Sequence, residues 1–211
     1  MNPKDSVLQT EIARLSREAV NIPSVIIIGD KSQAGTYVLR IRLREDKALQ
    51  IGRFKKGKLI SLPAGDYAYV GSALSEKGAT SLARRLVRHA TRSGDKRPHG
   101  IRNRMVEQFA ECGLGDGNLL PKRGKTLFWN IDFLLDLESA EIEGFSAIRS
   151  SARLEDRLAK KLEQDPHTQV IERGLGANDV PGNTHVLRVC GDESWWRSLP
   201  TVLANMIRDG S

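Results

Sequence analysis

Residues 67–89 constrain the fold most, because within them the chain changes from a strand into a strongly basic helix. The Tyr-Ala-Tyr-Val run at 67–70 is typical of a strand, and the Gly-Ser pair that follows it predicts a turn. Apolar residues at helical spacing then predict a helix over about 79–91, with Leu82 and Leu86 on one stripe. This order brings a tyrosine hydroxyl within reach of an arginine and a histidine, so the stretch is a candidate site.

Alternating side chains predict further strands around this unit. Residues 35–43 carry apolar side chains on one face and arginines on the other, which predicts a half-buried strand. A short run at 48–52 follows a charged turn, and we expect it to pair with the first strand as a hairpin. Strand character also marks residues 25–28, 59–62, 127–135, 140–148 and 184–189.

Helical spacing of apolar residues predicts helices before, between and after these strands, over residues 5–20, 101–112, 153–162 and 192–208. The sequence therefore predicts an α+β fold, a small and mainly antiparallel sheet flanked by helices. We expect one domain over residues 35–190, preceded by an N-terminal helical extension at 1–34. An inserted segment at about 94–126 is rich in Gly, Pro and charge, and a C-terminal helix at 191–211 packs on the domain.

The net charge of +7 is concentrated in residues 84–104, where Asp95 is the only acid. A basic block is often just a solvated face, but this imbalance favours contacts to phosphate. The residues expected to contact nucleic acid are Arg84, Arg88, Arg92, Lys96 and Arg97.

The chain shows no sign of a membrane or secretory protein. No apolar run approaches the roughly 20 residues needed to cross a bilayer, and the first residues lack the pattern of a secretory signal. Cys112 and Cys190 are too few for a metal quartet, so we expect unpaired thiols. These features predict a cytoplasmic protein with no membrane association.

Six short blocks of residues follow one another along residues 35–190. They are Gly35/Tyr37/Leu39, Gly65/Tyr67/Tyr69/Gly71/Ser72/Ala73, Arg85/Leu86/Arg88/His89, Trp129/Ile131/Asp132/Phe133/Leu134/Leu135, Glu155, and Gly174/Gly176/Asp179/His185. This series resembles the GIY-YIG nuclease superfamily, and within it the branch long known only as a domain of unknown function. The order of the blocks makes the resemblance specific, although each block alone is weak.

The resemblance implies a divalent-metal-dependent endonuclease that hydrolyses phosphodiester bonds in DNA, with a setting in repair or processing. Glu155 is then the ligand of one Mg²⁺ or Mn²⁺ ion, which takes few protein ligands. Arg85 offers a planar fork of donors to the phosphoryl group, and His89 lies on the same helix face, one turn later. Tyr37 or Tyr69 positions or deprotonates water, for which a phenol needs help from the metal or Arg85.

Each of these residues has a more common role when it is taken alone. Tyrosines in strands usually pack, and a helical glutamate is usually solvated. The rival hypotheses are a catalytically inactive nucleic-acid-binding module on the same scaffold and a structural or partner-binding protein that uses its terminal helices. Of the other histidines, His99 is expected to be solvent-exposed and His167 to lie in a turn, while a core role and a site role stay open for His185.

The chain departs from the branch pattern at positions that bear on substrate preference. Asn130 stands where the branch has a histidine, and Val180 and Gly182 stand where it has cysteines. Asp156 follows Glu155 in place of the usual cysteine. Any role of those cysteines is absent here, whereas the residues expected to act in catalysis are all retained.

Overall fold

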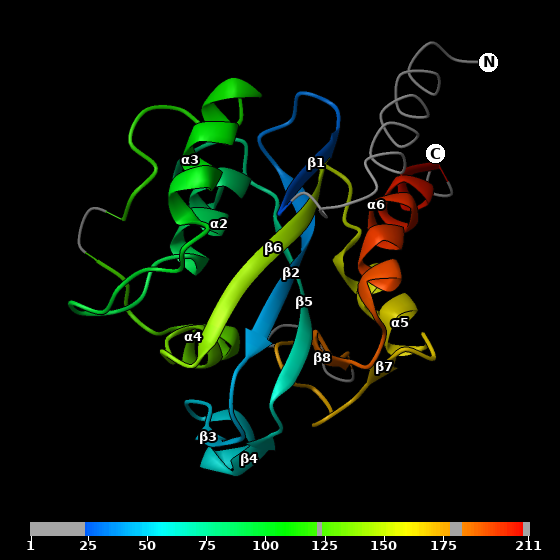
Figure 1. The fold of residues 1–211 in the computed structure, drawn as a ribbon. Helices are drawn as coiled ribbons and strands as arrows, with labels where there is room; N and C mark the ends of the chain where they lie inside the picture. Colours follow the sequence, from blue (N-terminus) through cyan, green and yellow to red (C-terminus); the bar gives the residue numbers. More distant parts are fainter. Residues whose placement is uncertain (1–23, 122–123, 178–182, 209–211) are drawn as a thin grey trace.

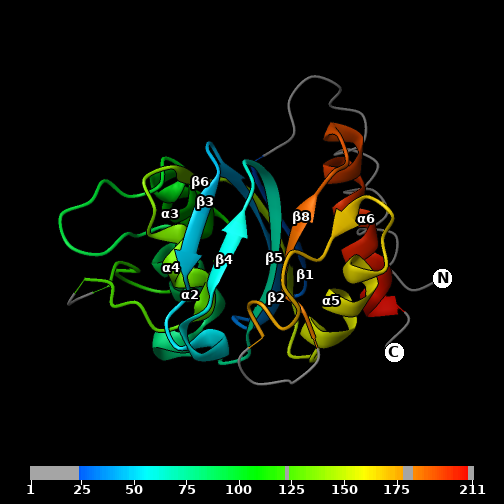
Figure 2. The ribbon, with the colours of Figure 1, turned by 90° about the horizontal axis from the view of Figure 1, so that it is seen from below.

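The computed structural model describes residues 24–121, 124–177 and 183–208, and it has an α+β architecture in three layers. A six-stranded sheet lies between two groups of helices (Figure 1). Seen from below, the helices α2 to α4 lie on one side of the sheet and α5 and α6 on the other (Figure 2). The predicted fold class is confirmed.

The main sheet has the strand order β1-β6-β2-β5-β8-β7, and only the β1–β6 pair is parallel. Its strands are β1 (Val25–Gly29), β2 (Gly35–Leu43), β5 (Gly65–Ala73), β6 (Ala140–Arg149), β7 (Thr168–Gln169) and β8 (Val186–Val189). The strands predicted at 25–28, 35–43, 67–70, 140–148 and 184–189 are thus present. Strand β1 lies within residues 1–34, the predicted extension, and belongs to the sheet; the helix predicted at 5–20 lies outside the described residues.

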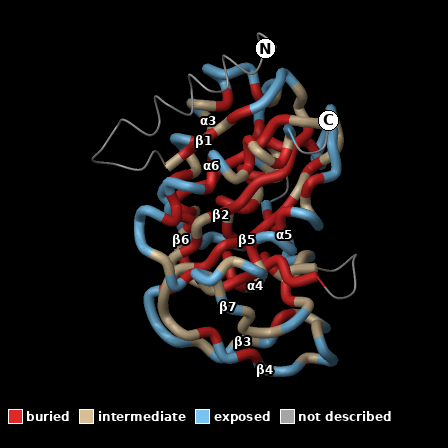
Figure 3. Tube along the Cα trace, turned by 90° about the vertical axis from the view of Figure 1, so that its right-hand side faces the viewer, coloured by how far each residue is buried: buried red, intermediate tan, exposed pale blue. Residues whose placement is uncertain are grey.

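Strand β2 is central and mostly buried (Figure 3), and its two faces enter two different hydrophobic cores. Tyr37, Leu39 and Ile41 lie in the core that α2, α3 and α4 cover. Val38, on the other face, packs in the core that α5 and α6 cover. The alternation was predicted correctly, but the strand is more deeply buried than a half-buried one because helices cover both faces of the sheet.

The helices of the first layer are α2 (Leu82–His89), preceded by the short helix η2 (Gly78–Thr80), α3 (Arg102–Glu111) and α4 (Asn130–Leu135). Those of the second layer are α5 (Glu155–Glu163) and α6 (Glu193–Arg208). Helix α3 buries Met105 and Phe109 completely in the first core. The segment at 94–126, expected as an excursion from the fold, is therefore an integral part of that core.

The hairpin predicted between residues 35–43 and 48–52 was wrong. Strand β3 (Lys47–Gln50) pairs with β4 (Leu59–Leu62) in a separate two-stranded sheet, with the short helix η1 (Phe54–Gly57) between them. The reason is that β5 and β6 already occupy both edges of β2. The small sheet stands beyond the end of the main one (Figure 1).

The strand predicted at 127–135 was also wrong, because residues 130–135 form helix α4. Ile131, Leu134 and Leu135 are buried at helical spacing. The Asp132 carboxylate accepts the backbone N–H groups of Phe128 and Trp129, both at 2.9 Å, which satisfies donors just before the helix. A short apolar run is compatible with strand or helix, and here the Asp132 cap decides for the helix.

One end of β5 is left open and creates room for a site. Strand β8 pairs with β5 only as far as Tyr69, which lies opposite Val186. From Gly71 onward β5 pairs with β2 alone. Helix α2 approaches this open end from one face of the sheet, and α5 approaches from the other (Figure 1).

Candidate active site

The two tyrosines expected in the site lie on neighbouring strands and face each other. Tyr37 belongs to β2 and Tyr69 to β5, and their ring centroids are 6.2 Å apart. Gly71 is paired directly opposite Tyr37, and a Cβ atom at Gly71 would lie 2.6 Å from the Tyr37 hydroxyl. The glycine of the Tyr-Val-Gly run is therefore needed to make room for the other tyrosine.

His89, the last residue of α2, packs against both tyrosines. Its Nε2 lies 2.8 Å from the Tyr37 hydroxyl, and the residue is 1% exposed. Burial, together with the charge of Lys125, lowers the pKa of His89 well below its ordinary value, so the imidazole is neutral at pH 7. A neutral imidazole offers one nitrogen that can accept a proton.

Asp132 lies next to His89 and binds Arg88. Its Oδ1 is 3.9 Å from His89 Nδ1, and Arg88 donates one hydrogen bond to each carboxylate oxygen at 2.9 Å. Burial opposes ionisation, but the Arg88 hydrogen bonds and the charge of Lys125 hold the pKa of Asp132 below its ordinary value. The carboxylate beside Nδ1 favours the tautomer with its proton there, which leaves Nε2 to accept the Tyr37 proton.

Glu155, the first residue of α5, reaches the same place from the other face of the sheet. The Ser72 hydroxyl donates to Oε2, and His185 Nδ1 lies 3.2 Å from Oε1. Burial opposes ionisation, but hydrogen bonds from His185 and Ser72 and the charge of Arg85 lower the pKa of Glu155 overall. The site thus holds an ionised carboxylate, and His185 is a neighbour of the site as well as a core residue.

Arg85 is an arginine of the cleft wall whose charge is not neutralised by an ion pair among the described residues. Its guanidinium lies 4.3 Å from the centroid of the Trp129 ring. No carboxylate lies within ion-pair distance of Arg85 in the described ranges of the chain, and its buried Nε has no hydrogen-bond partner there. An unpaired planar guanidinium is suited to bind a phosphoryl group through two hydrogen bonds.

A cleft of about 330 Å³ joins these groups at the open end of β5. Its walls include Tyr69, Ser72, Arg85, Trp129, Glu155 and His185. Tyr37 and His89 lie directly behind Tyr69, because each of their rings is within about 6 Å of the Tyr69 ring centroid. The structure therefore brings together all five residues predicted for catalysis and metal binding.

The cations predicted to contact nucleic acid differ in availability. Arg88 is bound by Asp132, and Lys96 forms an ion pair of 2.5 Å with Asp136. Arg84 is partly exposed and bonds to the Asn118 carbonyl at 2.8 Å, while Arg97 is exposed. The sequence shows the charges but not the partners, which lie more than thirty positions away in every one of these pairs.

Arg92 and His99 are both buried, contrary to prediction. Arg92 is 5% exposed and donates to the Ala140 carbonyl and, at 3.1 Å, to Glu141. His99 is 1% exposed; its Nε2 donates to the Leu135 carbonyl, and its Nδ1 accepts the Ile142 N–H. These two residues tie the segment after α2 to β6, so Arg92 is not available to a phosphate.

The residues present fit one divalent ion but not a multi-ligand centre. No group of three His, Cys, Asp or Glu side chains able to hold a metal occurs among residues 24–121, 124–177 and 183–208. Mg²⁺ keeps most of its water and is commonly bound by one or two carboxylates plus substrate phosphates. The ionised Glu155 in an open cleft meets that requirement, with Asp156 as its neighbour in sequence.

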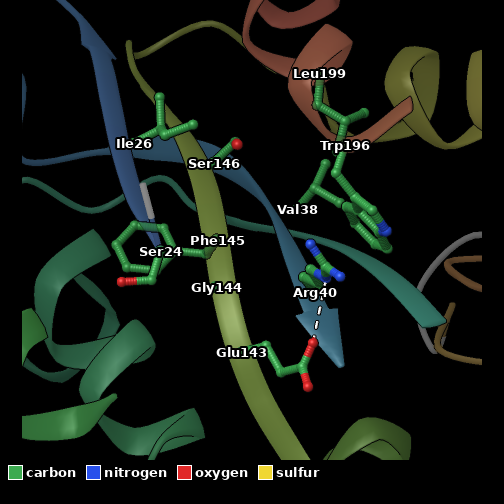
Figure 4. A pocket seen from close by; sticks show the side chains of 10 residues that line it. All are labelled: Ser24, Ile26, Val38, Arg40, Glu143, Gly144, Phe145, Ser146, Trp196 and Leu199. Atoms are coloured by element: carbon green, nitrogen blue, oxygen red, sulfur yellow. Dashed lines mark ion pairs between the residues drawn. The ribbon is translucent and has the colours of Figure 1, made fainter. Parts of the chain in front are cut away.

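A second pocket lies on the face of the sheet covered by α6 (Figure 4). Its volume is about 50 Å³, which is too small for a nucleotide. Arg40 enters it and stacks on Trp196, but Arg40 also pairs with Glu193 and Glu143. This pocket has no free charge to bind a ligand.

Sequence reasoning missed the residues that support the site. Asp132 and Trp129 belong to the blocks of the resemblance, but no role was assigned to either. Ser72 follows the Tyr-Val-Gly run directly, which was the available signal for it. No sequence signal pointed to Lys125, whose burial lowers its pKa to about 8 although Asp132 opposes the shift.

A family model described as a domain of unknown function, DUF123, matches residues 36–207. The chain belongs to this DUF123 family. The match runs from β2 to α6 and so contains every residue of the site described above.

Other comparisons add no relative of known activity. No significant match to a curated protein or to a solved structure was found. The DUF123 protein has no helix, within the part that the structure describes, that is long and apolar enough to cross a membrane. Cys112 and Cys190 are free and exposed, as predicted for unpaired thiols.

Proposed function

We propose that this DUF123 protein is a GIY-YIG-type nuclease, a divalent-metal-dependent endonuclease that hydrolyses phosphodiester bonds in DNA. One observation carries the proposal: an unpaired arginine and an ionised glutamate share a cleft with a tyrosine that is backed by a Tyr–His pair. Phosphodiester hydrolysis needs these functions in one place: a cation for the phosphoryl oxygens, a metal ligand, and a proton acceptor for water.

Arg85 binds the scissile phosphate in this mechanism. The guanidinium is free of carboxylates among the described residues and is held in place by the Trp129 ring at 4.3 Å. Because it is already oriented, it neutralises charge on the non-bridging oxygens without rearranging during the reaction. Glu155 would hold a Mg²⁺ or Mn²⁺ ion, which supplies further positive charge to the phosphoryl group and lowers the pKa of a bound water.

In this mechanism the proton of the attacking water passes along Tyr69, Tyr37 and His89, of which Tyr37 and His89 are hydrogen-bonded. Burial, and for Tyr69 also the charge of Glu155, raises the pKa of both site tyrosines, so each phenol is neutral and cannot act alone as a base. Tyr69 takes the water proton as its own hydroxyl proton passes to Tyr37. Tyr37 then donates to His89 Nε2, and the imidazolium faces the Asp132 carboxylate at 3.9 Å. Asp132 is a positioning residue, since it acts through His89.

The first test is incubation of the purified protein with labelled duplex, single-stranded and branched DNA in Mg²⁺ or Mn²⁺, with EDTA as control. We expect cutting of at least one substrate with metal and none with EDTA. The rival hypothesis, a nucleic-acid-binding module without turnover, predicts binding that weakens steeply with salt and no cutting of any substrate.

A further inference from the structure

Phe128 is the most exposed large hydrophobic residue among those described, with 73% of its surface accessible. Single exposed hydrophobic residues are common, so the exposure of Phe128 is informative only together with its surroundings. The backbone around it is fixed, because the Phe128 N–H donates to Asp132 at 2.9 Å and Arg88 donates to the Thr126 carbonyl at 2.7 Å. The ring is thus exposed on a well-anchored segment.

The exposed ring stands at the rim of the cleft. Its centroid lies 5.7 Å from that of Trp129, and the two rings are nearly perpendicular at 86°. Trp129 forms part of the cleft wall and carries the guanidinium of Arg85 at 4.3 Å. The Phe128 ring is therefore separated from Arg85, the phosphate-binding arginine of the proposed mechanism, by the Trp129 ring that contacts both.

We infer that Phe128 is a stacking platform for an unpaired nucleobase beside the scissile phosphate, so that the substrate class is DNA with single-stranded or extrahelical nucleotides near the cut. This inference rests on the proposed function. Within a duplex both faces of a base are covered by neighbouring bases, so a protruding ring stacks most readily on a base that has left the helix. Stacking on an aromatic side chain accepts any base, because every base has a π face.

A nucleic acid suits this rim better than an apolar protein segment. A nucleobase is joined to phosphates, and the Trp129 ring that packs against Phe128 also carries Arg85, which forms no ion pair among the described residues. An apolar peptide would leave that cation without a counterion. The site thus recognises a flat ring and an adjacent anion together.

The experiment measures DNA binding in EDTA, so that cutting is not required. The probes are oligonucleotides of one sequence that carry 2-aminopurine in a single strand, in a one-nucleotide bulge, or within a perfect duplex. Anisotropy gives the affinity and 2-aminopurine quenching reports stacking. Phe128→Ala should weaken binding of the single-stranded and bulged probes roughly 5- to 150-fold and abolish the extra quenching, with the duplex affinity nearly unchanged.

Two further variants keep this result interpretable. Phe128→Tyr retains the ring and should restore both signals, whereas Leu59→Ala removes a side chain that is 64% exposed elsewhere and should change neither. An equal loss for all probes, no loss at all, or a wild type that binds none of the probes would overturn the platform. A change of oligomeric state in Phe128→Ala would also overturn it, in favour of a protein interface.

The platform and the proposed function fail in different ways. If Phe128→Ala cuts single-stranded, bulged and duplex DNA in metal at the wild-type rates, the platform is refuted and the nuclease stands. If the wild type prefers unpaired probes through Phe128 but cuts nothing in Mg²⁺ or Mn²⁺, the platform stands and the nuclease is refuted.

Discussion

Two arginines stack on tryptophans on opposite sides of the central sheet, and their surroundings differ completely. Arg85 lies 4.3 Å from the Trp129 ring, and Arg40 lies 5.0 Å from the Trp196 ring. Arg40 forms ion pairs with Glu193 at 2.5 Å, with Glu143 at 3.3 Å and with Asp66 at 3.9 Å. In the described ranges, no such carboxylate pairs with Arg85.

The difference shows what separates a structural cation from a binding one. The side chain of Arg40 is 14% exposed, and the acids around it satisfy its charge, so it ties α6 to the sheet. Arg85 faces a cleft of about 330 Å³, against about 50 Å³ at Arg40. Both arginines thus make a cation–π contact, but Arg85 remains available to bind an anion, whereas Arg40 is neutralised by the acids around it.

Tyr37→Phe should have the largest effect on the cleft side. The change removes the hydroxyl that donates to His89 Nε2 but keeps the packed ring, so proton transfer is interrupted while the fold is retained. We expect the single-turnover cutting rate to fall by about 10²–10⁴-fold, with a loss of unfolding free energy of about 1 kcal/mol. An unchanged cutting rate would remove Tyr37 from the proton relay.

Arg85→Ala should lower the cutting rate by about 10²–10³-fold. Because Arg85 forms no ion pair in the described part of the chain, its removal breaks none, although Glu155 loses a nearby positive charge. Arg85→Lys should restore little, since an ammonium cannot reproduce the planar fork. If Arg85→Ala unfolds the protein and leaves the cutting rate of the folded fraction at the wild-type value, Arg85 is a structural cation like Arg40.

Arg40→Met should show the opposite pattern. It removes the ion pair of Glu193 and leaves the half-buried Asp66 with Arg42 alone, and we expect a loss of about 1–3 kcal/mol in urea unfolding. The cutting rate of the folded protein should stay within about twofold of wild type, because the Arg40 pocket is separate from the cleft. A large loss of cutting at full stability would show that the two sides are not distinct.

The pH dependence of stability provides a smaller test of the buried network. Burial lowers the pKa of His89 well below its ordinary value, against the opposing charge of Asp132 and with the support of Lys125, Arg85 and Arg88. The unfolded imidazole gains its proton near pH 6.5, so stability that is present above this pH is lost as the pH falls below it.

His89→Gln should therefore reduce the loss of unfolding free energy between pH 7 and pH 5 by about 2 kcal/mol. His167→Gln is the matched control, because the side chain of His167 is 58% exposed, and it should leave the loss as it is. Urea unfolding at the two pH values measures both variants. Equal pH slopes in His89→Gln and wild type would contradict a neutral, buried imidazole.

The parts of the fold that follow a local rule were predictable. Strands β2 and β5 follow the alternation of their side chains, and α2 and α6 follow helical spacing. Residues 130–135 were not predictable in this way, because a short apolar run suits a strand or a helix and only the bonds to Asp132 decide. The pairing of β3 depends on which edges of β2 are free, and that is a property of the whole sheet.

The candidate site shows the same division. Tyr37, Tyr69, Arg85, His89 and Glu155 were found because they lie in blocks with a recognisable order. The sequence does not show which cations form ion pairs. Arg88 and Arg85 look equivalent on the same helix, yet only Arg88 pairs with Asp132, forty-four positions further along the chain. Partners at that separation come from the fold and not from a motif.

The most direct measurement is the single-turnover rate at which Glu155→Gln cuts the preferred DNA substrate in saturating Mg²⁺, relative to wild type. The substitution keeps the size of the side chain and its contacts to Ser72 and His185 but removes the negative charge that would hold the metal. Our account predicts a rate at least about 10³-fold lower, with DNA affinity in EDTA and thermal stability close to wild type. Cutting at the wild-type rate by a folded Glu155→Gln protein would contradict it.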